Sequence, residues 1–226
     1  NDQEVTEIIQ ASLAQRGLLP GEHIVDTGYT TADILVNSIG RGVDIIGKVV
    51  LDPSWQRREE TGYDATAFTI DWGKQQMTCP QGQVNYRWTP TQTKYGTPLI
   101  SIEFSKSDCS PCSARLLCTR SKSQKRVLGI AAQPQFEAMQ AARQRQKTDE
   151  FWEKYAKRAG IEGTVSQATG AFGLRRSRYR GLAKTRLQHI ATAAAINLAR
   201  FSDWMMDKPR SKTRISHFAR LKPEAA

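Results

Sequence analysis

One stretch decides the fold: HIVDTGYTTADILVNSIGRGVDIIGKVVL, residues 23–51. It opens on a short apolar strand that ends in Asp26, and the glycine and threonines after it supply a turn and helix caps. Residues 31–39 predict a helix, and residues 43–51 form a nearly continuous apolar run, typical of a strand buried on both faces. This order predicts a parallel strand pair in an α/β sheet, with Asp26 at the C-terminal end of the first strand.

The regions on either side of this stretch differ in the spacing of their apolar residues and in their content of turn-forming residues. A one-sided helix is predicted over residues 3–16, and residues 52–133 carry short β-like runs, such as AFTIDW and PLISIEF, between glycine, proline and polar turns. From residue 134 onward the spacing of apolar residues is helical, with a final helix over residues 182–205. We therefore expect part of an α/β core over residues 1–51, an inserted β-rich module over 52–133, and a helical part over 134–226.

Composition excludes several classes of protein. Hydrophobic residues make up 39% and charged residues 24% of the 226, which is typical of a folded soluble protein. The longest nearly apolar run, residues 190–199, is far shorter than the roughly 20 residues that span a membrane. No secretory signal is evident, so we expect a cytoplasmic protein without a membrane segment, and the start at Asn1 suggests a clipped chain.

The net charge of +11 is unevenly distributed. Residues 1–119 hold 10 Lys and Arg against 14 Asp and Glu, whereas the remainder holds 23 against 8. Lys and Arg bind phosphate backbones by neutralising charge and releasing counterions. The second half is therefore predicted to bind nucleic acid, the alternative being a basic surface that serves solubility alone.

Two carboxylates stand out by their context. Asp26 ends a strand and precedes Thr-Gly-Tyr, where a glycine permits a sharp turn or a close ligand. Glu162 follows Arg158 by four residues and Tyr155 by seven, so one helix face would present an acid, a cation and a phenol. The alternative is that Asp26 is a cap, and that Glu162 is a surface acid paired with Arg158.

At these residues the sequence resembles insertion-sequence transposases of the DDE class, which have an RNase H-like core. The resemblance covers nearly the whole chain and is strongest in HIVDTGYTTADIL, CPQG, DCSPCSARLLCTRS, YAKRAGIEGTVSQ and GLRRSRYRGLAKTRLQHIATAAAINLAR. Tyr155, Arg158 and Glu162 match the family's Tyr-x2-Arg-x3-Glu-x6-Lys signature, but Thr169 occupies the lysine position. Arg175 or Lys184 lies near enough in sequence to take over the lysine's phosphate-binding role.

The resemblance implies a function and a cofactor. Asp26 and Glu162 would be two of three carboxylates that bind Mg²⁺ or Mn²⁺, and Tyr155 and Arg158 would contact DNA near the scissile bond. The implied reactions are strand cleavage at transposon ends and transfer into target double-stranded DNA, by a homodimer on paired ends. The first catalytic Asp belongs to a strand expected before residue 1, so the RNase H-like core is predicted to be incomplete at its N-terminus.

Four cysteines lie in the predicted insertion. Cys109, Cys112 and Cys118 form C-x2-C-x5-C, and Cys79 lies upstream in CPQG. Without a secretory signal, such a set suits a structural Zn²⁺ better than disulfides. Unligated thiols and a redox pair are the alternatives.

A dense basic segment follows at residues 173–186. Its basic residues favour contact with the DNA backbone, and an interleaved tyrosine could stack on an unpaired base. The residues predicted to bind DNA here are Arg175, Arg176, Arg178, Tyr179, Arg180 and Lys184. An ordinary solvated face is the alternative.

Two rival functions remain open at this stage. One is a catalytically inactive transposase remnant, and the other is a zinc-ribbon-like DNA-binding module in which both acids are structural. The separation of the Asp26 and Glu162 carboxylates would discriminate between them, because shared metal ions require the two groups to converge.

Overall fold

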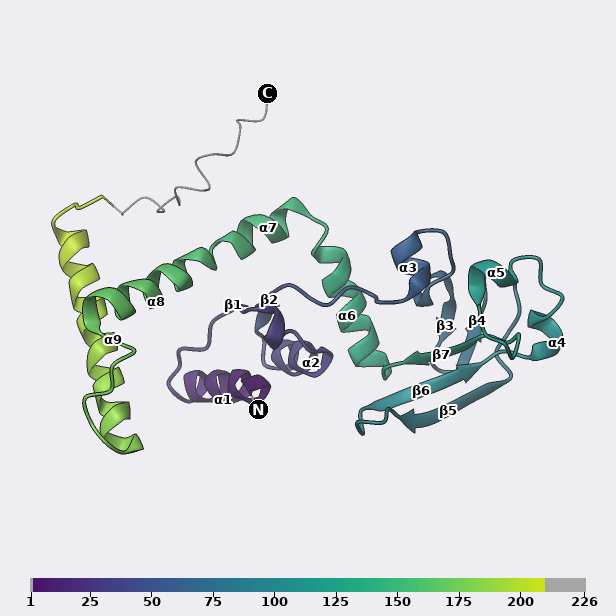
Figure 1. Cartoon of the computed structure of the whole chain (residues 1–226), viewed down its shortest axis with the longest axis horizontal. Helices are drawn as coiled ribbons and strands as arrows, with labels where there is room; N and C mark the ends of the chain where they lie inside the picture. Colours follow the sequence, from purple (N-terminus) through teal and green to yellow (C-terminus); the bar gives the residue numbers. More distant parts are fainter. Residues whose placement is uncertain (1, 210–226) are drawn as a thin grey trace, which may run out of the picture. The chain divides into compact units, whose positions relative to one another are not determined.

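A computed structural model of the chain describes residues 2–209 and has mixed α/β architecture (Figure 1). It divides into two compact units, the first ending at Arg158 and the second beginning at Ala159. Strands lie only in the first unit among the described residues, and they form one parallel pair, one antiparallel pair and one three-stranded antiparallel sheet. No helix among residues 2–209 is both long and apolar enough to cross a membrane.

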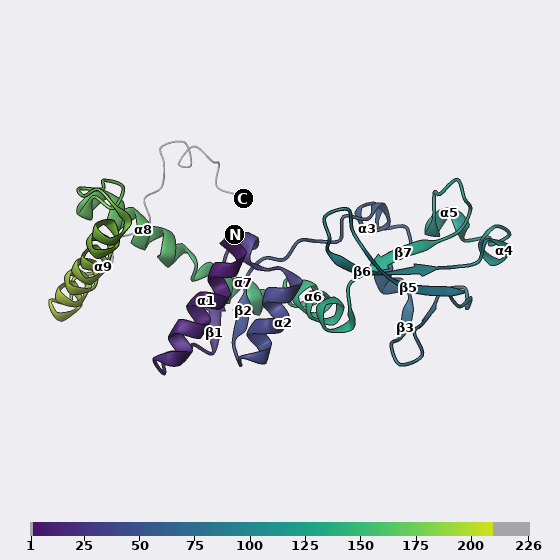
Figure 2. The same cartoon turned by 90° about the horizontal axis from the view of Figure 1, so that it is seen from below.

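The parallel pair predicted around Asp26 is present. Strand β1 (Glu22–Ile24) pairs in parallel with β2 (Asp44–Ile46), and helix α2 (Ala32–Gly40) connects them. The hydroxyl of Thr31 caps α2 by accepting a hydrogen bond from the amide of Ile34. Helix α1 (Asp2–Gln15) lies beside α2 in both views (Figure 1, Figure 2). A cluster of buried apolar side chains holds this layer together: Val25, Ile34, Leu35, Ile45, Val49 and Ala142.

The second strand is shorter than the apolar run that predicted it. The run covers residues 43–51, but β2 ends at Ile46. Beyond it, the amide of Val49 donates 2.7 Å to the side-chain oxygen of Gln146 rather than to a neighbouring strand. Val49 is therefore buried against α6, in the cluster that contains Ala142, whereas Val50 and Leu51 are exposed.

Helix α6 (Gln133–Arg145) connects two apolar clusters of the first unit. Ala142 and Met139 pack in the cluster around the parallel pair, whereas Phe136 packs against the cluster beneath the antiparallel strands. The ring of Phe136 lies 5.8 Å from that of Trp72. Arg145, at the end of α6, forms an ion pair of 2.5 Å with Asp44 of β2.

The antiparallel strands all fall within residues 52–133, where the sequence predicts a β-rich module. Strands β3 (Thr69–Asp71) and β4 (Gln76–Thr78) form one hairpin, while β5 (Arg87–Gln92), β6 (Pro98–Glu103) and β7 (Val127–Ile130) form the larger sheet. Short helices flank them: α3 (Trp55–Glu59), α4 (Lys106–Cys109) and α5 (Arg115–Cys118). Their shared core contains Phe68, Met77, Ile102, Phe104, Leu128 and Ile130.

Two further helices make up the described part of the second unit. Helix α8 (Ala159–Phe172) is joined to α9 (Leu182–Met205) by a loop, and α9 has the bounds that the sequence predicts. Arg200 of α9 donates to the side chains of Gln167 and Thr164 of α8, at 3.0 and 2.8 Å. Ala168 and Ile196 are the buried side chains of these two helices.

Candidate functional site

Asp26 is fixed at the C-terminal end of the parallel pair. The preceding residue, Val25, donates its amide to the carbonyl of Ile46, so β1 keeps its pairing up to the carboxylate. Oδ1 of Asp26 accepts the amide of Thr27 at 2.8 Å and caps the short 3-10 helix Thr27–Tyr29. The side chain remains 57% exposed. Asp26 is therefore both a cap, as the structural alternative predicted, and a carboxylate open to a ligand.

Arg158 contacts the other oxygen of this carboxylate. Its Nη2 lies 3.3 Å from Oδ2 of Asp26, although the two residues are 132 positions apart. The Arg158 guanidinium also lies 5.8 Å from the centre of the Tyr155 ring. The structure thus brings together three of the predicted site residues.

The prediction that Tyr155, Arg158 and Glu162 lie on one continuous helix is wrong. Helix α7 (Asp149–Ala156) ends after Tyr155, and α8 begins at Ala159, with Arg158 in the turn between them. The amide of Arg158 donates to the carbonyl of Tyr155, three residues back, which tightens the chain there. Through Arg158, this turn contacts the carboxylate of Asp26.

Helix α7 is anchored where it meets the parallel pair. Thr148 caps its N-terminus, and Phe151 is buried. Lys154 forms ion pairs with Glu22 at the start of β1, at 2.8 Å, and with Glu150, at 3.3 Å. The hydrogen bond between Lys154 and Glu22 lowers the pKa of the Glu22 carboxyl and raises that of the Lys154 amine. Tyr155 is therefore carried on an anchored helix, and Arg158 lies in the turn that directly follows this helix.

Lys48 is a candidate site residue that the sequence did not single out. Its Nζ lies 5.1 Å from the ring centre of Trp152 and 5.3 Å from that of Tyr155. Its carbonyl accepts the hydroxyl of Thr30 at 2.7 Å. Lys48 follows β2 as Asp26 follows β1, and parallel strands place their carboxyl ends at one edge. The feature of the sequence that could have identified Lys48 is its position as a lysine inside the apolar run of residues 43–51.

Gly47 permits the close packing at this edge. A Cβ added to it would lie 2.5 Å from Cγ2 of Thr30, 2.8 Å from Cγ2 of Val25 and 3.0 Å from the carbonyl oxygen of Val25. Such distances are too short for any other residue without a shift of its neighbours. Gly47 therefore sets the spacing between β2 and the segment that carries Asp26.

The remaining residues predicted for catalysis and DNA binding belong to the second unit. Glu162 lies in the first turn of α8. The loop between α8 and α9 and the first turn of α9 carry the basic segment, in which the following side chains are exposed: Arg175, Arg176, Arg178, Tyr179, Arg180 and Lys184. Gln188 of α9 holds this loop, because it donates to the carbonyl of Arg176 and accepts the amide of Arg178.

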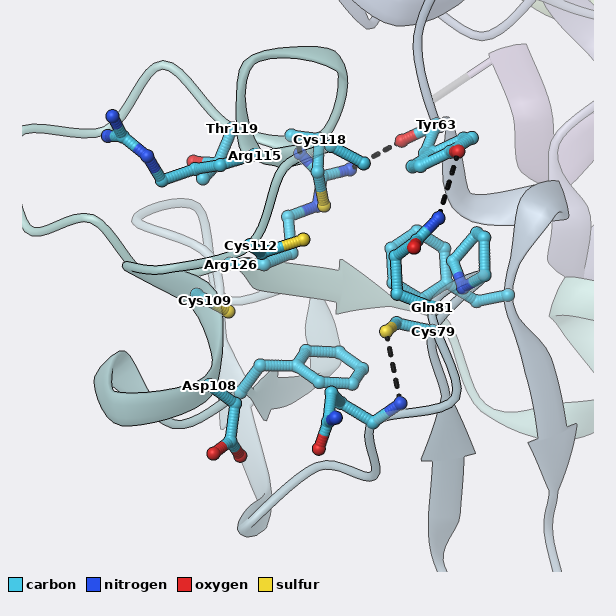
Figure 3. Close-up of a pocket in the computed structure, with 15 residues that line it drawn as sticks. Tyr63, Cys79, Gln81, Asp108, Cys109, Cys112, Arg115, Cys118, Thr119 and Arg126 are labelled. Carbon is cyan, nitrogen blue, oxygen red and sulfur yellow. Dashed lines mark hydrogen bonds between the residues drawn. The ribbon is translucent and has the colours of Figure 1, made fainter.

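The four cysteines line one cavity of the first unit (Figure 3). Within residues 2–209, however, no group of three or more His, Cys, Asp or Glu is arranged to hold a metal ion. The four cysteines therefore do not form a ready-made metal site in this conformation.

Comparison with known proteins gives one match. A sequence model of the family described as transposase DDE domain matches residues 78–202, more than half of the chain. The matched segment contains the cysteines, Glu162 and the basic segment, whereas Asp26 lies before it. No curated protein and no solved structure matches the chain.

Proposed function

The chain belongs to the transposase DDE domain family, and we propose that Asp26 and Glu162 are two carboxylates of its metal-dependent catalytic centre. In this proposal the centre cleaves DNA at transposon ends and transfers the ends to target DNA. The observation that supports it most directly is the strand-end position of Asp26, whose exposed carboxylate is contacted by Arg158. Membership of the family supports transposition as the biological process.

The fold fits this role in outline. We propose that β1, α2 and β2 are part of an RNase H-like core, with residues 52–133 as an insertion and residues 134–226 as its helical part. The parallel pair with its crossover helix supports the first assignment, and the antiparallel strands β3–β7 support the second. A pair of chains acting on paired DNA ends completes the proposal.

The chemistry of the donors fits a hard cation. Carboxylate oxygens are the ligands that Mg²⁺ and Mn²⁺ prefer, and Asp26 offers an exposed carboxylate beside a basic side chain. When bound, such ions activate the attacking hydroxyl and stabilise the leaving oxygen.

The cations around Asp26 have a separate role. The planar fork of Arg158 suits a phosphate group, and its ion pair with Asp26 holds that fork at the strand end. Lys48, held against Trp152 and Tyr155, adds a second cation at the same edge. These side chains would position a phosphate beside the carboxylate.

A cleavage assay tests the proposal. The protein expressed from its complete gene should nick labelled DNA that carries the ends of its own element, in Mg²⁺ or Mn²⁺, and should lose this activity in EDTA. DNA binding should survive in EDTA. If the protein bound these ends but never cut them in either metal, a non-catalytic DNA-binding role would replace the proposed one.

The basic segment makes a quantitative prediction about salt. Each side chain that neutralises a phosphate contributes about 0.9 to the slope of log affinity against log salt. Replacing Arg178 and Arg180 together by Ala should therefore lower the slope by about 2, measured by fluorescence anisotropy across a potassium chloride series.

A matched double variant provides the control. Arg57 and Arg58 are exposed on α3, and their replacement by Ala removes the same charge from the first unit. We expect it to leave the slope nearly unchanged. Equal decreases in the two double variants would show that net charge, rather than the segment at residues 173–186, determines DNA binding.

A further inference from the structure

Four cysteine side chains from separate segments line one small cavity of the first unit (Figure 3). Cys79 follows β4, Cys109 and Cys118 end the short helices α4 and α5, and Cys112 lies between those helices. The cavity has a volume of about 30 Å³ and is lined almost wholly by apolar surface and sulfur. Thirty positions separate Cys79 from Cys109, so tertiary folding, rather than sequence spacing alone, brings the set together.

The turn around Cys79 is shaped to present its sulfur. The amide of Gly82 donates to the carbonyl of Cys79 at 2.8 Å, with Gly82 at a φ of 82°. The amide of Gln83 then donates to Sγ of Cys79 at 3.3 Å. This turn therefore fixes the position of the Cys79 sulfur at the cavity.

Cys109 and Cys112 share a second tight turn. The amide of Cys112 donates to the carbonyl of Cys109 at 3.3 Å, which keeps the two positions of the C-x2-C pair close. Such a pair can contribute two sulfur ligands to one ion without any rearrangement of distant chain. Cys118 reaches the cavity from the next helix.

A buried cation completes the environment. Arg126 donates Nη1 to the carbonyl of Cys118 at 2.7 Å, while its Nε is buried without a hydrogen-bond partner. Burial lowers the pKa of this guanidinium, so its charge is retained at a cost in desolvation. Negative charge nearby compensates that cost, and a cysteine thiolate in the cavity would add to the carboxylates of Asp52 and Asp64 that already act on Arg126.

We propose that Cys79, Cys109, Cys112 and Cys118 bind one Zn²⁺ ion in this cavity. Sulfur ligands select a soft or borderline cation over Mg²⁺, and four of them satisfy tetrahedral Zn²⁺ without an open position. The role is structural: the ion joins the β4 turn to the two short helices. Binding would bring each sulfur to about 2.3 Å from the metal, and it requires the four side chains to converge, because no group of three or more such ligands among residues 2–209 is already arranged to hold an ion.

Zinc binding must also displace protons. Burial raises the pKa of the Cys118 thiol to about 11. Four thiols that become thiolates release up to four protons to the buffer for each ion bound. The proposal does not depend on the proposed transposition function, because the site lies in the β-rich part of the first unit and needs no DNA.

The test measures metal in the purified full chain. We expect about one zinc ion per chain, measured by inductively coupled plasma mass spectrometry. Exchange with Co²⁺ should produce an intense sulfur-to-cobalt charge-transfer band and the visible bands of tetrahedral cobalt. Cys112→Ser should lose most of the bound metal. Ser113→Ala, a change at the exposed neighbouring residue, should keep all of it.

The cobalt spectrum of the unmodified chain decides the question even if the cysteine variant fails to fold. A metal-free chain without a cobalt charge-transfer band would overturn the proposal. So would a folded Cys112→Ser variant that keeps its full zinc content. A thiol titration that finds two thiols fewer, together with an intact mass lower by two hydrogen atoms, would show a disulfide. A disulfide would also contradict the proposed zinc site.

Discussion

Asp26→Asn is expected to reduce DNA strand cleavage by at least about a hundredfold and to leave the fold intact. The side-chain oxygen of asparagine can still accept the hydrogen bond from the backbone amide of Thr27. Asparagine also caps helices about as well as aspartate does. What it loses is the charge that a divalent cation and Arg158 require. The ion pair that disappears is exposed on the side of Asp26, so the unfolding free energy should change by no more than about 1 kcal/mol.

The control for this variant is Asp33→Asn. Asp33 is an exposed carboxylate in the first turn of α2, where it accepts a hydrogen bond from Gln135. Its replacement should leave cleavage nearly unchanged. Glu162→Gln, on the second unit, should reproduce the loss seen in Asp26→Asn. Cleavage at the unmodified rate in Asp26→Asn, measured on labelled transposon ends in Mg²⁺, would remove Asp26 from the catalytic centre.

The parallel pair and the last helix could be predicted because their signals are local. The apolar run before Asp26, the cap at Thr31 and the apolar spacing of α9 each lie within the element that they define. The break between α7 and α8 has no such signal. It falls at Lys157 and Arg158, both good helix formers, and neither glycine nor proline occupies those two positions.

The candidate site likewise combines residues that have a local signal in the sequence with contacts that have none. The pairing of Asp26 with Arg158 joins positions 132 apart. The sequence singled out both residues, but the ion pair it offered for Arg158 was with Glu162 rather than with Asp26. Lys48 was missed because its partners, Trp152 and Tyr155, lie far from it in the sequence. Convergence of Asp26 and Glu162 stays a prediction, because the two residues belong to separate units.

Gly47→Ala is expected to destabilise the first unit. The added methyl group would meet two side-chain carbons, on Thr30 and Val25, and the backbone oxygen of Val25. Side chains can give way, but that carbonyl belongs to the chain that leads directly into Asp26. Overpacking of this kind costs about 1–3 kcal/mol, so urea unfolding should show a loss of that size.

Gly40→Ala supplies the matched control. Gly40 ends α2, and a Cβ there would meet nothing within 4 Å, so the same change should be neutral or stabilise the helix by up to about 1 kcal/mol. Gly47→Ala should also lower cleavage more than its stability loss explains, because Val25 precedes Asp26 and Thr30 follows the 3-10 helix that Asp26 caps. Stability and cleavage equal to those of Gly40→Ala would mean that the edge carrying Asp26 and Lys48 is looser than its packing indicates. In that case the position of Asp26 would have to be fixed by its ligands, and adding Mg²⁺ or DNA should then restore protection of the β1 and β2 amides from hydrogen exchange.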